Sequence, residues 1–141
     1  MSAIPYKAYA VEQYKEATVQ TSPGKLVIAL YDGAIRFSLV ALDAMKRGDV
    51  AVQGVNLGKA QNILLHLNGT LDMSAGAIAK ELNGIYTYCI QRLLVANADD
   101  RQDYVEEVVA LLKPLREAWE AAEKSFASER IAAVEGLGGI R

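Results

Sequence analysis

The chain has 141 residues, of which 52% are hydrophobic, and a formal net charge of −2 at pH 7. This length suits one domain with its own core, and the apolar share excludes a chain that is disordered throughout. The slightly negative charge predicts no binding of nucleic acid, and no apolar run reaches the ~20 residues of a membrane span. The single cysteine, Cys89, excludes an internal disulfide, and the N-terminus lacks the apolar segment of a signal peptide. We therefore expect a cytoplasmic protein without direct membrane insertion.

Apolar residues recur at spacings of three and four along the chain, and strand patterns are nearly absent. This spacing predicts helices. We expect a short helix near 6–18 and four longer ones near 23–46, 50–71, 75–98 and 102–127. Because the joints between the longer helices are only a few residues long, neighbouring helices should be antiparallel. The predicted fold is all-α, an antiparallel up-down four-helix bundle with a short N-terminal capping helix.

Three segments follow from this pattern. We expect an N-terminal lid segment at 1–20, a helical bundle at 21–128 and a flexible, glycine-containing C-terminal tail at 129–141. The predicted N-terminal helix of roughly a dozen residues is too short to be stable alone, so it must dock on the bundle. Its tyrosines suit docking because each has an apolar ring and a hydroxyl that can stay wet. It is either a detachable lid or a permanent fifth helix that completes the core.

The second predicted helix begins with a capping signal, Ser22 followed by Pro23. On a helical wheel its charged residues share one narrow sector, and apolar residues occupy both flanks. This helix should therefore contact neighbours over most of its surface, with Asp32 and Arg36 forming an exposed ion pair. The sequence SPGK lacks the first glycine and the spacing of a phosphate-binding loop, and no strand precedes it.

His66 is the only histidine of the chain, so one chain cannot supply a two-histidine metal site. It lies opposite the inward stripe of Ala60, Leu64 and Leu67 on the wheel and should be exposed. An exposed histidine on a four-helix bundle is typical of a phosphotransfer domain. HLNG is close to the H-x-L-K-G pattern of that class, although its glycine comes one position early and the lysine is absent. We expect no catalytic group, metal or cofactor elsewhere.

Apolar residues also lie off the inward stripes of the third and fourth predicted helices. Leu65 is one, and Ile90 and Leu94 flank the stripe that contains Cys89, which we expect to be buried and unreactive. Such surplus apolar surface indicates either a broad core or homodimer face, or a groove for an amphipathic helix of another protein. In the last helix, Pro114 interrupts the backbone bonds, but the apolar stripe continues through it. We therefore expect one kinked helix rather than two.

Four segments together resemble the flagellin export chaperone family, FliS. They are AYAVEQYKEATVQTSPGKLVIALYDGAIRFSLVALDAM, KAQNILLHLNGTLD, LNGIYTYCIQRLLVAN and LLKPLREAWEAA, and they cover about residues 8–122 in order. SPGKL followed by LYDGAIRF is the most specific part. The chain departs from the family at Gly84-Ile85, where leucine is usual before the tyrosines, and at Pro114.

The resemblance implies a monomeric cytoplasmic export chaperone that is not an enzyme. Such a protein binds the disordered C-terminal region of flagellin, prevents premature polymerisation and delivers flagellin to the flagellar type III secretion gate. A histidine phosphotransfer relay that uses His66 is the alternative function. From the resemblance and the surplus apolar surface we expect the partner-binding residues to be Ile4, Tyr6, Tyr9, Tyr14, Leu65, Tyr86, Ile90 and Leu94.

Overall fold

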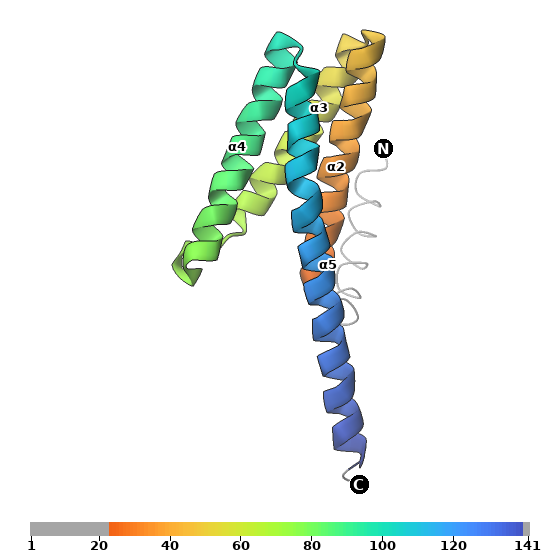
Figure 1. The fold of residues 1–141 in the computed structure, drawn as a ribbon, viewed down its shortest axis with the longest axis vertical. Coiled ribbons are helices and arrows are strands. Elements are labelled where there is room, and N and C mark those ends of the chain that lie inside the picture. Colours follow the sequence, from red (N-terminus) through yellow and green to blue (C-terminus); the bar gives the residue numbers. More distant parts are fainter. Residues whose placement is uncertain (1–22, 140–141) are drawn as a thin grey trace, which may run out of the picture. The chain divides into compact units, whose positions relative to one another are not determined.

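The computed structural model describes residues 23–139, and all of their side chains except those of 130 and 137–139. The elements in this range are helical: α2 (Pro23–Arg47), α3 (Val50–Gly69), the short 3-10 helix η1 (Met73–Ala75), α4 (Ala77–Asp99) and α5 (Gln102–Gly139) (Figure 1). This confirms the predicted all-α class. The predicted N-terminal helix near 6–18 lies outside the described residues. Of the helices described, none combines the length and apolarity that crossing a membrane requires.

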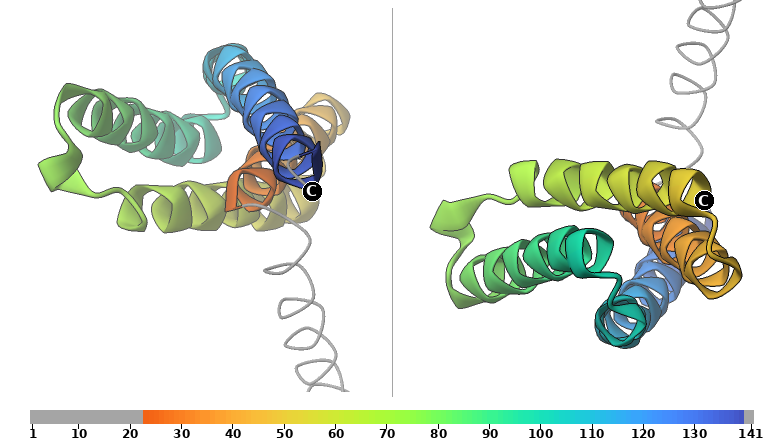
Figure 2. Two further views of the ribbon diagram at one scale, coloured as in Figure 1. Left: turned by 90° about the horizontal axis from the view of Figure 1, so that it is seen from below. Right: turned by 90° about the horizontal axis from the view of Figure 1, so that it is seen from above.

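The chain forms two compact units. Residues 29–117 make up one, called here the bundle unit, and residues 1–28 with 118–141 make up the other, called the end unit. Within the bundle unit each successive helix reverses direction, as the short joints predict (Figure 1). Helices α3 and α4 lie side by side, and η1 joins them at one end (Figure 2).

The helices of the bundle unit end where local side chains supply caps. Asp49 accepts a hydrogen bond from the backbone N–H of Val52 at 3.1 Å and so caps the start of α3. Asp72 accepts bonds from the backbone N–H and the hydroxyl of Ser74, which together lower the pKa of its carboxyl. Helix α4 ends at Asp99, and the C-cap residue Asp100 has a left-handed φ of 54°. Asp49 and Asp72 thus cap the starts of α3 and η1, Asp100 follows the end of α4, and the chain reverses at these joints.

Small residues on α2 allow the other helices to approach closely. A Cβ added at Gly33 would lie 3.0 Å from Cδ1 of Ile63, so glycine at this position lets α3 pack against α2. The same helix buries Ala34, Ser38, Ala41 and Ala44. Larger side chains fill the core from the other helices: Leu57, Leu64, Leu67, Tyr86, Cys89, Leu93, Val105, Val108 and Leu112. Burial of Cys89 confirms the prediction for this residue.

Two tyrosines meet inside the bundle unit. Tyr31 of α2 and Tyr86 of α4 are both buried, and their hydroxyl oxygens are 2.5 Å apart, with ring centroids separated by 6.2 Å. Burial raises the pKa of Tyr86 far above its usual value, and the bond to Tyr31 adds to this shift. The Tyr86 phenol therefore stays neutral, and the hydroxyl pair satisfies polar groups that the apolar core would otherwise penalise.

The predicted ion pair between Asp32 and Arg36 is wrong. Asp32 instead accepts a hydrogen bond from Nε of Arg116 on α5, at 2.8 Å, and the guanidinium of Arg36 lies 5.0 Å from the ring centroid of Phe37. The Asp32–Arg116 pair is partly exposed, so it contributes no more than about 1 kcal/mol to stability. It nevertheless ties α2 to α5, which the local spacing did not indicate.

Helix α5 continues through Pro114 as one helix, which confirms that prediction. Val108 and Leu112 on the preceding turns are fully buried, so packing of this face offsets the hydrogen bond that proline removes. The helix extends to Gly139, well past its predicted end near 127. Flexibility of the segment 129–141 stays a prediction.

The tyrosine pair yields a prediction for stability. Tyr31→Phe removes the hydroxyl that pairs with Tyr86 in the core, so we expect it to lower the free energy of unfolding by about 1–3 kcal/mol. The double variant Tyr31→Phe, Tyr86→Phe should cost less than the sum of the two single variants, because it leaves neither hydroxyl behind. Chemical denaturation followed by circular dichroism measures all three. Strict additivity would show that the two hydroxyls do not stabilise each other.

Candidate partner-binding surface

The residues that could carry chemistry lie apart from one another. His66 is exposed on α3, as predicted, whereas Cys89 is fully buried in α4. Burial raises the pKa of the Cys89 thiol to about 12, and the charge of Glu107 acts in the same direction. The thiol is therefore a packed core group and not a nucleophile. Within residues 23–139, no three side chains of the types that bind metals come together in a metal-binding group.

Both α3 and α4, which pack against each other, carry exposed apolar side chains. Leu65 on α3 and Leu94 on α4 are 55% and 60% exposed, and Ile90, one turn before Leu94 on α4, is half-buried. Polar contacts hold the seam together: Gln61 donates to the backbone carbonyl of Ile90 at 3.3 Å, and Gln53 donates to the side chain of Asn97 at 3.2 Å. We call Leu65, Ile90 and Leu94 the α3–α4 face.

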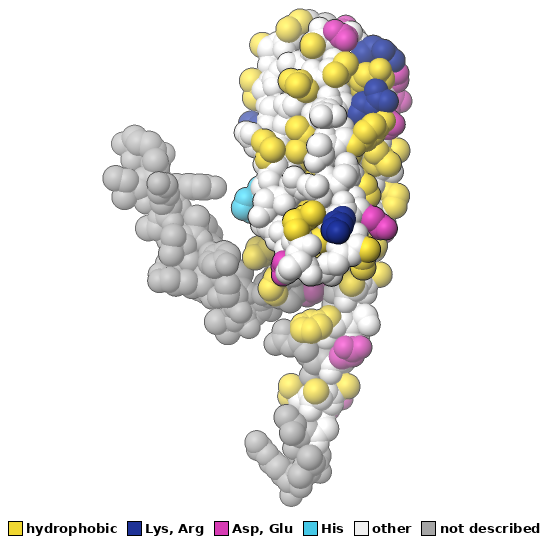
Figure 3. Space-filling view, turned by 90° about the vertical axis from the view of Figure 1, so that its left-hand side faces the viewer, with side chains coloured by type: hydrophobic (Ala, Val, Ile, Leu, Met, Phe, Trp, Pro, Cys, Tyr) yellow, Lys and Arg dark blue, Asp and Glu magenta, His cyan; other side chains and the backbone are white. Residues whose placement is uncertain are grey.

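The α3–α4 face suits contact with a partner because the backbone of α3 is accessible near it, in addition to the exposed side chains. Gly58 lies about two turns before Leu65 on α3. A Cβ added at Gly58 would meet nothing within 4 Å. Figure 3 shows one side of the molecule, on which apolar patches alternate with polar surface. Separated apolar side chains of this kind are suited to an extended or amphipathic partner that touches several of them.

The structure places the predicted partner-binding residues in three groups. Leu65, Ile90 and Leu94 lie on the α3–α4 face. Tyr86 is only 2% exposed, so it is a core residue and the surface does not offer it to a partner. Its hydroxyl instead makes a buried hydrogen bond with that of Tyr31 on α2. The four N-terminal candidates lie outside the described residues: Ile4, Tyr6, Tyr9 and Tyr14.

A cluster that the sequence did not predict links α4 to α5. The Tyr88 hydroxyl donates to Glu107 at 2.7 Å, and Nε of Arg92 lies 3.0 Å from the same carboxylate. The Arg92 guanidinium also lies over the Tyr104 ring, 4.0 Å from its centroid, and Arg101 lies 4.1 Å from that centroid. The spacing of Tyr88 and Arg92, one helical turn apart, was the only local signal for this cluster. It fixes Glu107 in one orientation.

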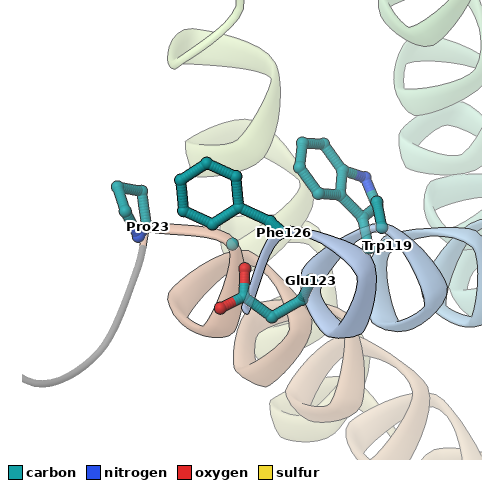
Figure 4. Close-up of a pocket in the computed structure, with 6 residues that line it drawn as sticks. Pro23, Trp119, Glu123 and Phe126 are labelled. Carbon is teal, nitrogen blue, oxygen red and sulfur yellow. The ribbon is translucent and has the colours of Figure 1, made fainter. Parts of the chain in front are cut away.

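The end unit carries a separate groove of about 290 Å³. It is lined by Pro23, Gly24, Trp119, Ala122, Glu123 and Phe126. The Phe126 ring lies between Pro23 and the Trp119 indole, with the Glu123 carboxylate at one side (Figure 4). Phe126 is 50% exposed, so this groove, called the end groove, presents aromatic surface to solvent.

Comparison with known proteins assigns the family. The family model described as "Flagellar protein FliS" matches residues 6–125. The chain belongs to the FliS family. A relative named "Flagellar secretion chaperone FliS" from Bacillus subtilis (strain 168) is 33% identical over 136 residues, which cover 96% of each chain. One of the same name from Salmonella typhimurium (strain LT2) is 38% identical over 128 residues, 88% of this chain and 95% of the relative.

A third FliS relative, from Campylobacter jejuni, is 35% identical over 117 residues and covers 82% of this chain and 88% of its own. These alignments span most of each FliS protein, so the match is to the whole fold and not to one motif. Family membership supports an export-chaperone role for the chain.

His66 gives a prediction that tests whether its exposed position has a function. His66→Ala should change the free energy of unfolding by no more than roughly 0.5 kcal/mol, because the substitution removes a solvated side chain from a helix surface. Thermal and chemical denaturation measure this effect. Incubation with acetyl phosphate should leave His66 unmodified, and a phosphate on this residue, detected by mass spectrometry, would favour the phosphotransfer relay instead.

Proposed function

We propose that this FliS-family protein is a cytoplasmic, monomeric export chaperone for flagellin and not an enzyme. It binds the disordered C-terminal region of flagellin, prevents premature polymerisation and delivers the client to the gate of the flagellar type III secretion apparatus. The observation that carries the proposal is the α3–α4 face, where Leu65 and Leu94 are exposed on a chain that matches the FliS family.

The physical basis is coupled folding and binding. A disordered terminus with amphipathic segments cannot bury its own apolar side chains, and a small helical bundle with exposed apolar side chains can cover them. The client loses about 2–5 kcal/mol in ordering, which a large contact area offsets. Such binding needs no catalytic group, and it leaves the client able to unfold again when it is released.

The first test measures binding by calorimetry. Full-length flagellin should bind, and flagellin that lacks its C-terminal region should not, because the truncation removes the segment that the proposal assigns to the chaperone. Binding should also show a negative heat-capacity change, since apolar area leaves water. Unchanged affinity for the truncated flagellin would rule out this mode of recognition.

A matched pair of variants locates the contact. Replacing Leu65 and Leu94 by glutamine should weaken flagellin binding by about tenfold or more if both side chains are buried in the complex. Val134 on α5 is 68% exposed, and Val134→Gln serves as the control for loss of an exposed apolar side chain. Equal binding by the double variant and the wild type would remove the α3–α4 face as the client site.

We further propose that residues 1–20 act as a lid over part of the client surface. Support comes from the end groove, an exposed aromatic surface that is lined in part by Pro23, the first described residue. The tyrosines and isoleucine of the lid are suited to such a groove. The segment Thr21-Ser22-Pro23-Gly24 is a natural hinge between lid and bundle.

Deletion of residues 1–17 tests the lid. It should change the free energy of unfolding little, while it increases the binding of an apolar dye and alters the affinity for flagellin. In the free full-length protein, amides of 6–18 should exchange hydrogen much faster than those of 26–42, because a detachable segment opens without global unfolding. Equal protection of both segments would identify the N-terminal helix as a permanent part of the core.

A further inference from the structure

Helices α4 and α5 of the bundle unit line a second, shallow and open groove of about 510 Å³. It is lined by Glu81, Gly84, Ile85, Tyr88, Glu107 and Leu111. Tyr88 and Leu111 are each 37% exposed, so the groove offers apolar surface. Its lining also includes the carboxylates of Glu81 and Glu107. We call it the α4–α5 groove. It lies on the opposite flank of α4 from the α3–α4 face.

Gly84 is placed inside a helix where neither packing nor backbone geometry requires glycine. A Cβ added there would meet nothing within 4 Å, and Gly84 does not have the positive φ that Gly48 and Gly76 have. Glycine in a helix interior destabilises it relative to alanine. The structural consequence of Gly84 is instead an opening in the α4–α5 groove, where a partner can approach the backbone of α4.

The two carboxylates of the groove differ in their surroundings. Tyr88 and Arg92 already hold Glu107. Glu81 is exposed and makes no ion pair with any residue of the described range. It lies three residues before Gly84, so the two positions are neighbours on the surface of α4. An apolar opening with an uncompensated negative charge beside it is complementary to an apolar side chain with a nearby lysine or arginine.

We propose that the α4–α5 groove binds a segment of the client that carries an apolar side chain and a lysine or arginine about one helical turn apart. The apolar side chain occupies the opening at Gly84, and the cation pairs with Glu81. This inference rests on the proposed function, because it takes the C-terminal region of flagellin as the client. The client then contacts α4 on both flanks, which a disordered segment can do because it can wrap around a large surface.

The first experiment fills the opening. Calorimetry with full-length flagellin compares wild type with Gly84→Leu, Gly84→Ala and Gln91→Leu. Gly84→Leu should weaken binding by about tenfold, because its side chain occupies the space of the client's apolar group. Gln91 is exposed on the same helix and does not line the groove, so Gln91→Leu should bind like wild type.

Thermal unfolding of the same variants separates binding from folding. Gly84→Ala should raise the unfolding midpoint by roughly 2–4 °C, because alanine favours the helix, and should weaken binding less than leucine does. Higher stability with lower affinity is the expected result, and a folding defect cannot produce it. If both Gly84 variants bind as tightly as wild type, the groove is not a client site. If wild type itself does not bind flagellin, the proposed function fails and this inference fails with it.

The second experiment tests the charge. Glu81→Lys should weaken flagellin binding, and the difference from wild type should shrink as salt is added. Glu106 is an exposed carboxylate on α5 outside the groove, so Glu106→Lys makes the same change in net charge and should have a smaller effect. Equal losses in the two variants would assign the effect to net charge and overturn the pairing with Glu81.

Discussion

The hydroxyl contact between Tyr31 and Tyr86 fixes the rotation of α4 in the bundle, and the surfaces of the protein follow from that rotation. With Tyr86 inward, Cys89 and Leu93 also point into the core and are fully buried. The remaining positions of the helix must then face one flank or the other. If α4 were rotated by one residue, Ile90 would be buried and the Tyr86 hydroxyl would lose its contact with Tyr31. The hydroxyl pair therefore specifies one packing of α4, whereas apolar contacts alone permit several.

The two flanks of α4 differ in chemistry. The flank toward α3 presents Ile90 and Leu94. The flank toward α5 presents Glu81, Gly84 and Tyr88 and faces Glu107 of α5. The first surface is suited to apolar contact, and the second adds a charge that favours one orientation of a partner. The disordered client that we propose would benefit from this combination. Apolar area supplies binding free energy, whereas charge supplies specificity without a deep pocket.

Local pattern predicted much of this protein because it depends on near neighbours in the sequence. Spacings of three and four predicted the four longer helices, and α2, α3 and α4 begin and end within a few residues of the predicted bounds. The same periodicity predicted that Cys89 is buried and that His66 is exposed. Continuity of the apolar stripe through Pro114 predicted one helix, because burial along a whole face outweighs one lost hydrogen bond.

Tertiary packing decided which helix covers each face. Asp32 has Arg36 one turn away in its own helix, yet it pairs with Arg116, 84 positions further along the chain. Tyr86 was predicted to bind a partner, whereas the structure buries it against Tyr31 on α2. Gly84 gave no local sign of a groove, because a groove exists only when a second helix supplies the other wall. A sequence determines which residues share a face, and the fold determines what that face meets.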